Sequence, residues 1–97
     1  MERQERARLL ADVTDDKRFW CCDGQVFKNM SELRDGLSKM SDETYRYHAG
    51  QDKNDFSRWV AEVMGDEKLA ASLTKANSRT EARRAVAQRI TALSRAR

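Results

Sequence analysis

The fold is decided by residues 48–70, HAGQDKNDFSRWVAEVMGDEKLA. Apolar side chains stand at positions 56, 59, 60, 63 and 64, which is the i, i+3, i+4, i+7, i+8 spacing of one buried helix face. Asn54 or Asp55 is suited to cap the start of this helix, and Gly65 is suited to end it in a left-handed conformation. The stretch therefore predicts a polar loop, an amphipathic helix over about 55–64 and the start of another helix.

Further helices are expected on both sides of this stretch. The short motif Ser78-Arg-Thr-Glu81 has the form of a capping box, in which a serine hydroxyl and a glutamate three residues later satisfy the first free amides of a helix. Ser31, Ser41 and Asp66 are further candidates for N-caps. The additional helices are predicted at residues 2–13, 31–39, 42–49, 66–74 and 78–97.

A β-hairpin is predicted over residues 18–29. Asp23-Gly24 stands between two runs of aromatic and branched side chains, which is typical of a two-residue type I′ turn. That turn would place Trp20 opposite Phe27 on one face of the hairpin and Phe19 on the other. Both faces would be partly apolar, so we expect helices against one and a smaller contact or a partner on the other.

The predicted fold class is α+β and mostly helical, with one two-stranded antiparallel β-hairpin packed on five or six short helices. Strands do not alternate with helices, which excludes a parallel α/β sheet. The chain has 97 residues, enough for a single domain. We divide it into an N-terminal helix and linker (1–17), a body of hairpin and helices (18–74) and a basic C-terminal helix (78–97).

The order of these motifs resembles a family of small archaeal and bacterial domains. The resemblance rests on the Asp-Gly hairpin, on NDFSRWV at 54–60 after His48, and on GDEKLA at 65–70. It covers about residues 18–74, and His48 followed by Asn-Asp-Phe-x-x-Trp is its most specific part. No activity is established for that family. The resemblance therefore implies a compact intracellular domain and assigns no catalytic residue.

The sequence favours a cytoplasmic protein that does not enter a membrane. No run of about 18–20 apolar residues could span a bilayer, and the charged N-terminal residues MERQERAR are unlike a signal peptide. Cys21 and Cys22 are adjacent, so they cannot close a loop with a disulfide. We expect them to be reduced thiols on a strand.

The basic residues are concentrated at the C-terminal end. Residues 75–97 hold seven basic and one acidic side chain, a net charge of +6, whereas residues 1–74 hold twelve basic and fifteen acidic, a net charge of −3. Lysines and arginines on phosphates are the basis of nucleic-acid affinity, but the arginines here surround their helix instead of forming one stripe. The candidate contacts for a partner or a nucleic acid are Arg79, Arg83, Arg84, Arg89 and Arg95.

Metal and catalytic sites are not expected. Cys21, Cys22 and His48 are the candidate metal ligands, but adjacent strand residues point to opposite faces. His48 could act as a general base with Asp52 or Asp55 as the orienting carboxylate, although a structural histidine at a helix end is the favoured interpretation. We predict no metal, no cofactor and no small-molecule substrate.

A recognition corner formed by His48, Asn54 and Asp55 beside Trp59 is a further candidate site. The favoured interpretation is again structural, with Asn54 or Asp55 as a helix cap and Trp59 in the core. Taken together, the sequence predicts a small non-enzymatic module that binds another protein or a second copy of itself. Its partner surface would be the basic C-terminal helix, with the second face of the hairpin as a further candidate. The alternative is a nucleic-acid-binding protein that uses the C-terminal helix.

Overall fold

The computed structural model describes residues 2–95; residues 1, 96 and 97, the ends of the predicted domain, lie outside this range. The fold is α+β and mostly helical, as predicted, with one two-stranded antiparallel sheet in the described residues. In chain order the elements are α1 (Arg3–Leu10), η1 (Asp15–Lys17), β1 (Phe19–Trp20), β2 (Val26–Phe27), α2 (Met30–Lys39), α3 (Asp42–His48), α4 (Asp55–Trp59), η2 (Val60–Met64), α5 (Glu67–Lys75) and α6 (Arg79–Ser94).

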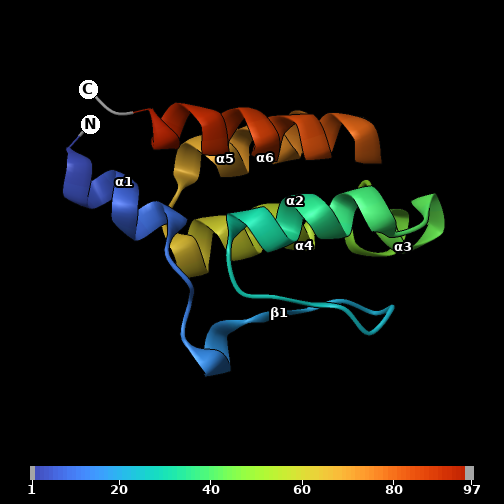
Figure 1. Ribbon diagram of the computed structural model, residues 1–97. Coiled ribbons are helices and arrows are strands. Elements are labelled where there is room, and N and C mark those ends of the chain that lie inside the picture. Colours follow the sequence, from blue (N-terminus) through green and yellow to red (C-terminus); the bar gives the residue numbers. More distant parts are fainter. Residues whose placement is uncertain (1, 96–97) are drawn as a thin grey trace.

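The helices form two layers, and the hairpin covers the outer side of one of them (Figure 1). One layer contains α5 and α6, and the other contains α2, α3 and α4, with the hairpin beneath. The basic helix α6 packs on α2, α5 and α1, and Ala82, Val86 and Leu93 on its inner face are buried. The C-terminal helix is therefore part of the packed body and does not project from it.

Most helices start at a predicted capping residue. Helix α1 starts without a side-chain cap, and in α2 the side chain of Asn29, not that of Ser31, accepts the amide of Glu32 at 2.8 Å. The carboxylate of Glu32 in turn accepts the amide of Lys28 at 3.0 Å, so the cap has both halves of a capping box. Ser31 is followed three residues later by an arginine, not by a glutamate or glutamine, so it could form only one half of a capping box. The predicted caps that the structure confirms are Ser41, Asn54, Asp66 and Ser78.

The predicted helix over residues 55–64 changes its hydrogen-bond spacing midway. It is α-helical through α4 and becomes a π-helix in η2. The amide of Gly65 donates to the carbonyl of Val60, five residues back, and Gly65 ends the helix with a φ of +78°. Trp59 is buried, as predicted, and its indole N–H donates to the carbonyl of Lys17 at 2.8 Å.

The register of the hairpin differs by one residue from the predicted register. Phe19 pairs with Phe27, and Trp20 pairs with Val26. Phe19 and Phe27 therefore share the buried face, with exposures of 7% and 2%, whereas Trp20 points outward and is 72% exposed. The predicted face that combined Trp20 with Phe27 is wrong.

The turn explains the shift in register. It has three residues, 22–24, because the amide of Cys21 donates to the carbonyl of Gln25 at 2.9 Å and the amide of Gly24 donates to that of Cys21 at 3.0 Å. A type I′ turn requires positive φ at both central residues. Here only Gly24 has a positive φ, of +96°, and Asp23 keeps an ordinary backbone conformation.

The inner face of the hairpin is held by aromatic packing. The Phe19 ring stacks on Phe56 at a centroid distance of 5.1 Å and meets the Trp59 ring edge-on at 5.6 Å. Phe27 lies against Gly36 of α2, where a methyl group would overlap the Phe27 ring. An isolated hairpin is marginal in water, so these contacts keep it on the helices and fix which side chains face outward.

Candidate functional site

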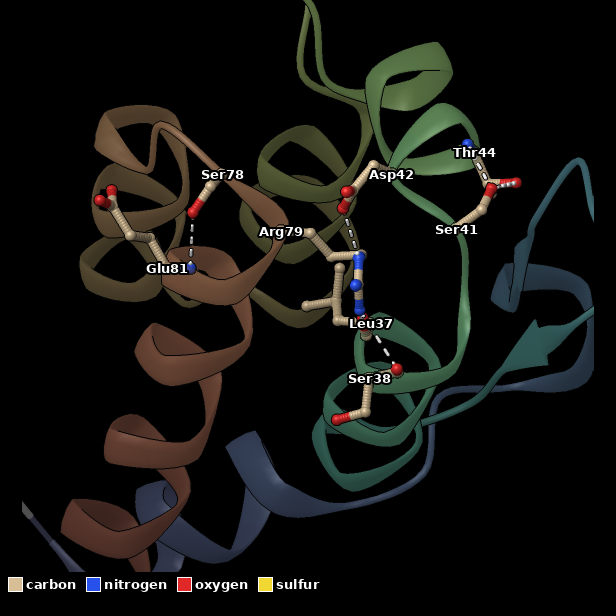
Figure 2. Close-up of polar contacts among 8 residues, drawn as sticks. All are labelled: Leu37, Ser38, Ser41, Asp42, Thr44, Ser78, Arg79 and Glu81. Atoms are coloured by element: carbon tan, nitrogen blue, oxygen red, sulfur yellow. Dashed lines mark hydrogen bonds and ion pairs between the residues drawn. The ribbon is translucent and has the colours of Figure 1, made fainter.

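Arg79, in the first turn of α6, joins the end of α2 to the start of α3 (Figure 2). Its Nη1 donates to the carbonyl oxygens of Leu37 and Ser38 at 2.8 and 3.1 Å, and its Nε donates to a carboxylate oxygen of Asp42 at 2.9 Å. The last carbonyls of a helix have no partner within it, so Arg79 caps α2. Arg79, which was predicted to contact a partner, therefore bonds to neighbouring helices of its own chain.

Arg83 and Arg89 also bond to the body of the protein. The Nε of Arg83 donates to the hydroxyl of Ser38 at 2.7 Å. The Nε of Arg89 donates to Asp66 at 2.8 Å, and these two side chains are only 12% and 1% exposed. The other carboxylate oxygen of Asp66 caps α5 through the amide of Leu69, so Arg89 neutralises a buried capping charge.

Arg84 and Arg95 are the predicted contact residues that face outward. They line a shallow groove of about 380 Å³ on the outer face of α6, together with Arg83. Arg95 also borders a second hollow, of about 710 Å³, which Arg3 and Arg6 of α1 line as well. Among the described residues that line these two hollows, none is acidic.

His48 is buried at the end of α3 and is bonded through both ring nitrogens. Its Nε2 accepts the backbone amide of Cys22 at 3.0 Å, so the proton is on Nδ1, which donates to Asp55 at 2.9 Å. Of the two carboxylates considered for this role, Asp55 is therefore the partner and Asp52 is not. The nitrogen that a general base would offer to a substrate is occupied by a backbone amide.

Asp55 has a perturbed pKa. Partial burial would raise the pKa of this carboxyl, but the hydrogen bonds from His48 and from Lys53, at 2.9 and 3.0 Å, outweigh it and hold the pKa below its usual value. Asp55 is therefore a charged anchor that joins the end of α3 to the start of α4.

The predicted recognition corner is a structural joint. The Asn54 side chain accepts the amide of Ser57 at 3.0 Å and donates to the carbonyl of Leu73 at 3.1 Å, so it ties α4 to α5. His48 and Asp55 do lie together, but Asn54 turns toward α5 and bonds to neither. The three residues hold α3, α4 and α5 in place.

A hollow of about 920 Å³ lies beside this joint, between the loop 50–53 and the segment from α5 to α6. It is open and polar, and Asn54 and Arg79 are among the residues that line it. These two side chains already bond to neighbouring elements. Other polar side chains, among them Arg46, Asp52 and Asn77, line the hollow as well.

An exposed aromatic pair is the feature that the sequence did not reveal. Trp20 is 72% and Tyr47 is 63% exposed, and among the described residues they are the large hydrophobic side chains left in solvent. Tyr47 packs edge-on against His48, and Trp20 borders the same hollow as His48 and Arg58. Lys53 lies over the Tyr47 ring at 5.0 Å. We call Trp20, Tyr47, Lys53 and Arg58 the aromatic surface.

Cys21 and Cys22 lie beside this surface and close to His48. The sulfur atoms and a ring nitrogen of His48 all lie within 4.8 Å of one another. The expectation that the two cysteines point apart is wrong, because Cys22 belongs to the turn and not to a strand. Cys22 is exposed and Cys21 is buried, and burial raises the pKa of Cys21 to about 11.

Comparisons of the chain with models of protein families, with curated proteins and with solved structures find no match. The family resemblance of residues 18–74 therefore stays a prediction. Within residues 2–95, no helix has both the length and the apolar character needed to cross a membrane.

Proposed function

We propose that the protein is a small non-enzymatic module that binds another protein through its aromatic surface. The observation that supports this is the outward position of Trp20 and Tyr47 on a domain whose other large apolar side chains, in the described residues, are packed inside. Exposed aromatic side chains are enriched in protein–protein interfaces. The packing of the core does not require either ring to face solvent.

Both rings are displayed by ordered elements. Trp20 is held in β1 by its pairing with Val26 and by its buried neighbour Phe19, and Tyr47 is held against the His48 ring. Rigid tryptophan and tyrosine side chains bury much area at little cost in entropy, and they are enriched among residues that dominate binding energy. The adjacent Lys53 and Arg58 already pair with Asp55 and Glu62, so the two rings are the groups that match an apolar pocket on a partner.

The test is affinity capture with the full chain immobilised, using a nuclease-treated extract of the source cells. Trp20→Ala and Tyr47→Ala should each weaken the captured protein's affinity by roughly 30-fold, which corresponds to about 2 kcal/mol for a central binding residue. The double variant Arg84→Ala/Arg95→Ala is the matched control, since it truncates two exposed side chains elsewhere. Equal binding by wild type and both aromatic variants would end the proposal.

A second copy of the chain is the alternative protein partner. Sedimentation of the purified protein over a range of concentrations identifies it directly. If the partner is a second copy, the protein self-associates and Trp20→Ala abolishes the association. Self-association that Trp20→Ala leaves intact would show that another surface makes the contact.

Nucleic-acid binding through α6 is the second candidate function. It is favoured by one observation, namely that Arg83, Arg84 and Arg95 line one groove that continues past Arg95 toward Arg3 and Arg6 without an acidic lining residue in the described chain. Such a row would follow a phosphate backbone. Against it, Arg79, Arg83 and Arg89 are engaged by the fold.

Electrophoretic mobility shifts at low and moderate salt test this candidate. If it is right, short DNA or RNA shifts at low salt, the shift weakens steeply with salt, and Arg84→Ala/Arg95→Ala removes most of it. The control is Arg46→Ala/Arg58→Ala, which removes the same charge from the other side of the protein. No shift at low salt, or equal loss in both double variants, would rule out a specific role for α6.

A further inference from the structure

We infer that Cys21, Cys22 and His48 form a site for a zinc ion, with two thiolate sulfurs and one imidazole nitrogen as ligands. The three ligand atoms lie within 4.8 Å of one another. Sulfur and imidazole nitrogen are the donors that Zn²⁺ prefers, and two cysteines with one histidine form a known three-ligand set that leaves the fourth position open.

The geometry needs only a small adjustment to hold the ion. Zinc binds sulfur at about 2.3 Å and nitrogen at about 2.0–2.1 Å, which separates tetrahedral ligand atoms by roughly 3.5–3.8 Å. Starting from at most 4.8 Å, the ligands must close by about 1 Å. Cys22 is exposed and lies in the turn, so its side chain can move without disturbing the core.

His48 is already oriented as a metal ligand. Its Nδ1–H is held by the carboxylate of Asp55 at 2.9 Å, which leaves the lone pair on Nε2 directed toward the cysteine turn. Metal-binding histidines usually donate their second nitrogen to a carboxylate or a carbonyl in this way, and the carboxylate fixes the tautomer and makes the ligand more basic. Asp55 is therefore a positioning residue for the site.

The ion must replace one hydrogen bond of His48. Nε2 accepts the backbone amide of Cys22 at 3.0 Å, and this amide belongs to an exposed residue that water can solvate once the bond is broken. Binding also releases one proton from each thiol, so that Zn²⁺, two thiolates and a neutral imidazole make a site with no net charge. Water at the fourth position would complete the tetrahedron on the exposed side.

The site is tested by titrating the reduced full chain with Co²⁺, which reports thiolate ligation by a charge-transfer band in the near ultraviolet. The band should reach its maximum at one ion per chain, and Zn²⁺ should displace it whereas Mg²⁺ should not. The sequence contains two cysteines and one histidine, so a thiolate band can arise only from Cys21 and Cys22. Absence of the band would overturn the inference, and a maximum at half an ion per chain would show a site shared between two chains instead.

Substitutions then distinguish a site that includes His48 from one formed by the two thiols alone. Cys22→Ser and His48→Gln should each weaken Co²⁺ affinity at least as much as Asp55→Asn, for which a loss of roughly 10–100-fold is expected of a residue that orients a ligand. If His48→Gln binds as tightly as wild type, the imidazole is not a ligand and the proposed site is wrong. Trp20→Ala is the control, since it alters the neighbouring surface and leaves the ligands in place.

Thermal unfolding provides a readout that needs no spectroscopic probe. A ligand that binds only the folded chain raises its unfolding temperature, so Zn²⁺ should raise the Tm of wild type and Trp20→Ala but not that of Cys22→Ser. Because Cys22 is exposed, this variant should fold even if His48→Gln does not. A Tm that rises equally in Cys22→Ser would contradict the site. Neither outcome depends on protein capture, so the metal site and the interaction module can fail separately.

Discussion

The arginines of α6 and the aromatic residues of the hairpin and α3 differ in how far the fold leaves their side chains free to contact a partner. Residues 75–97, which include α6, have a net charge of +6, yet Arg79, Arg83 and Arg89 bond to α2, to α3 or to the N-cap of α5. The hairpin is only a two-stranded ribbon, yet it leaves Trp20 72% exposed to solvent. Surface charge is thus a weaker guide to a binding site than side chains that the fold leaves unpacked.

The difference follows from the contacts that each residue type can make with the rest of the protein. A guanidinium can satisfy helix-end carbonyls and buried carboxylates, as Arg79 and Arg89 do, and this places basic residues where the fold needs donors. A large exposed ring gains nothing from solvent, and burying it would be favourable. We therefore propose that Trp20 becomes buried only when a partner binds.

The two tryptophans give the largest expected contrast. Trp59→Ala should lower the free energy of unfolding by roughly 3–5 kcal/mol, because it removes a buried indole and leaves a cavity. Trp20→Ala should change it by less than about 0.5 kcal/mol, as for other exposed positions. Urea denaturation of both variants measures this, and a loss below about 1 kcal/mol for Trp59→Ala would mean that the core assignment is wrong.

Substitutions of a buried and an exposed arginine of α6 should likewise differ in their effect on stability. Arg89→Ala should cost about 3 kcal/mol, because it leaves the carboxylate of Asp66 buried without its counter-charge. Arg84→Ala, on the outer face, should cost less than about 0.5 kcal/mol. Thermal unfolding of the two variants side by side makes the comparison. Equal stabilities would show that the Arg89–Asp66 pair does not support the fold.

A smaller effect is expected where the hairpin rests on α2. Gly36→Ala should destabilise the protein by about 1–3 kcal/mol, because the added methyl group overlaps the Phe27 ring and the hairpin or α2 must shift. Gly50→Ala is the control, since its methyl would meet only the Arg46 carbonyl, at 3.7 Å. If Gly36→Ala is as stable as Gly50→Ala, the hairpin does not pack on α2 as described.

The smallest effect concerns Asp55 and should depend on pH. The pKa of Asp55 lies below its ordinary value of 3.8, so its stabilising effect is complete above that pH and is lost as the pH falls through the lower folded value. Asp55→Asn should cost about 1 kcal/mol at neutral pH, and the difference from wild type should vanish in acid. Unfolding curves at several pH values test this, and a pH-independent difference would contradict the assignment.

Local signals in the sequence were sufficient for most of the helices. Ser41, Asn54, Asp66 and Ser78 cap helices in the structure because each cap depends on a backbone amide only three residues away. The burial of Trp59 likewise followed from helical spacing. The π-helical turns of η2 could not be predicted, because they preserve the same apolar pattern with a different hydrogen-bond spacing.

The candidate sites depended on contacts between distant residues, which the pattern alone did not reveal. A single residue added to the hairpin turn shifts the register by one, so the side chains of one strand change face relative to the other. Phe19, and not Trp20, therefore shares the buried face with Phe27. The partner of Arg79 is separated from it by 37 residues. One usable signal was overlooked: Tyr45 and Tyr47 are two apart on one helix, so when one ring is buried the other points away.

The most direct test of the central claim, that the aromatic surface binds a partner, is acrylamide quenching of Trp20 fluorescence. The chain has two tryptophans, so a Trp59→Phe variant reports on Trp20 alone. If this surface binds a partner, acrylamide quenches Trp20 freely in the isolated protein, and Trp20 becomes strongly protected once the captured partner is bound. Protection in the isolated protein, or full quenching in the complex, would contradict it.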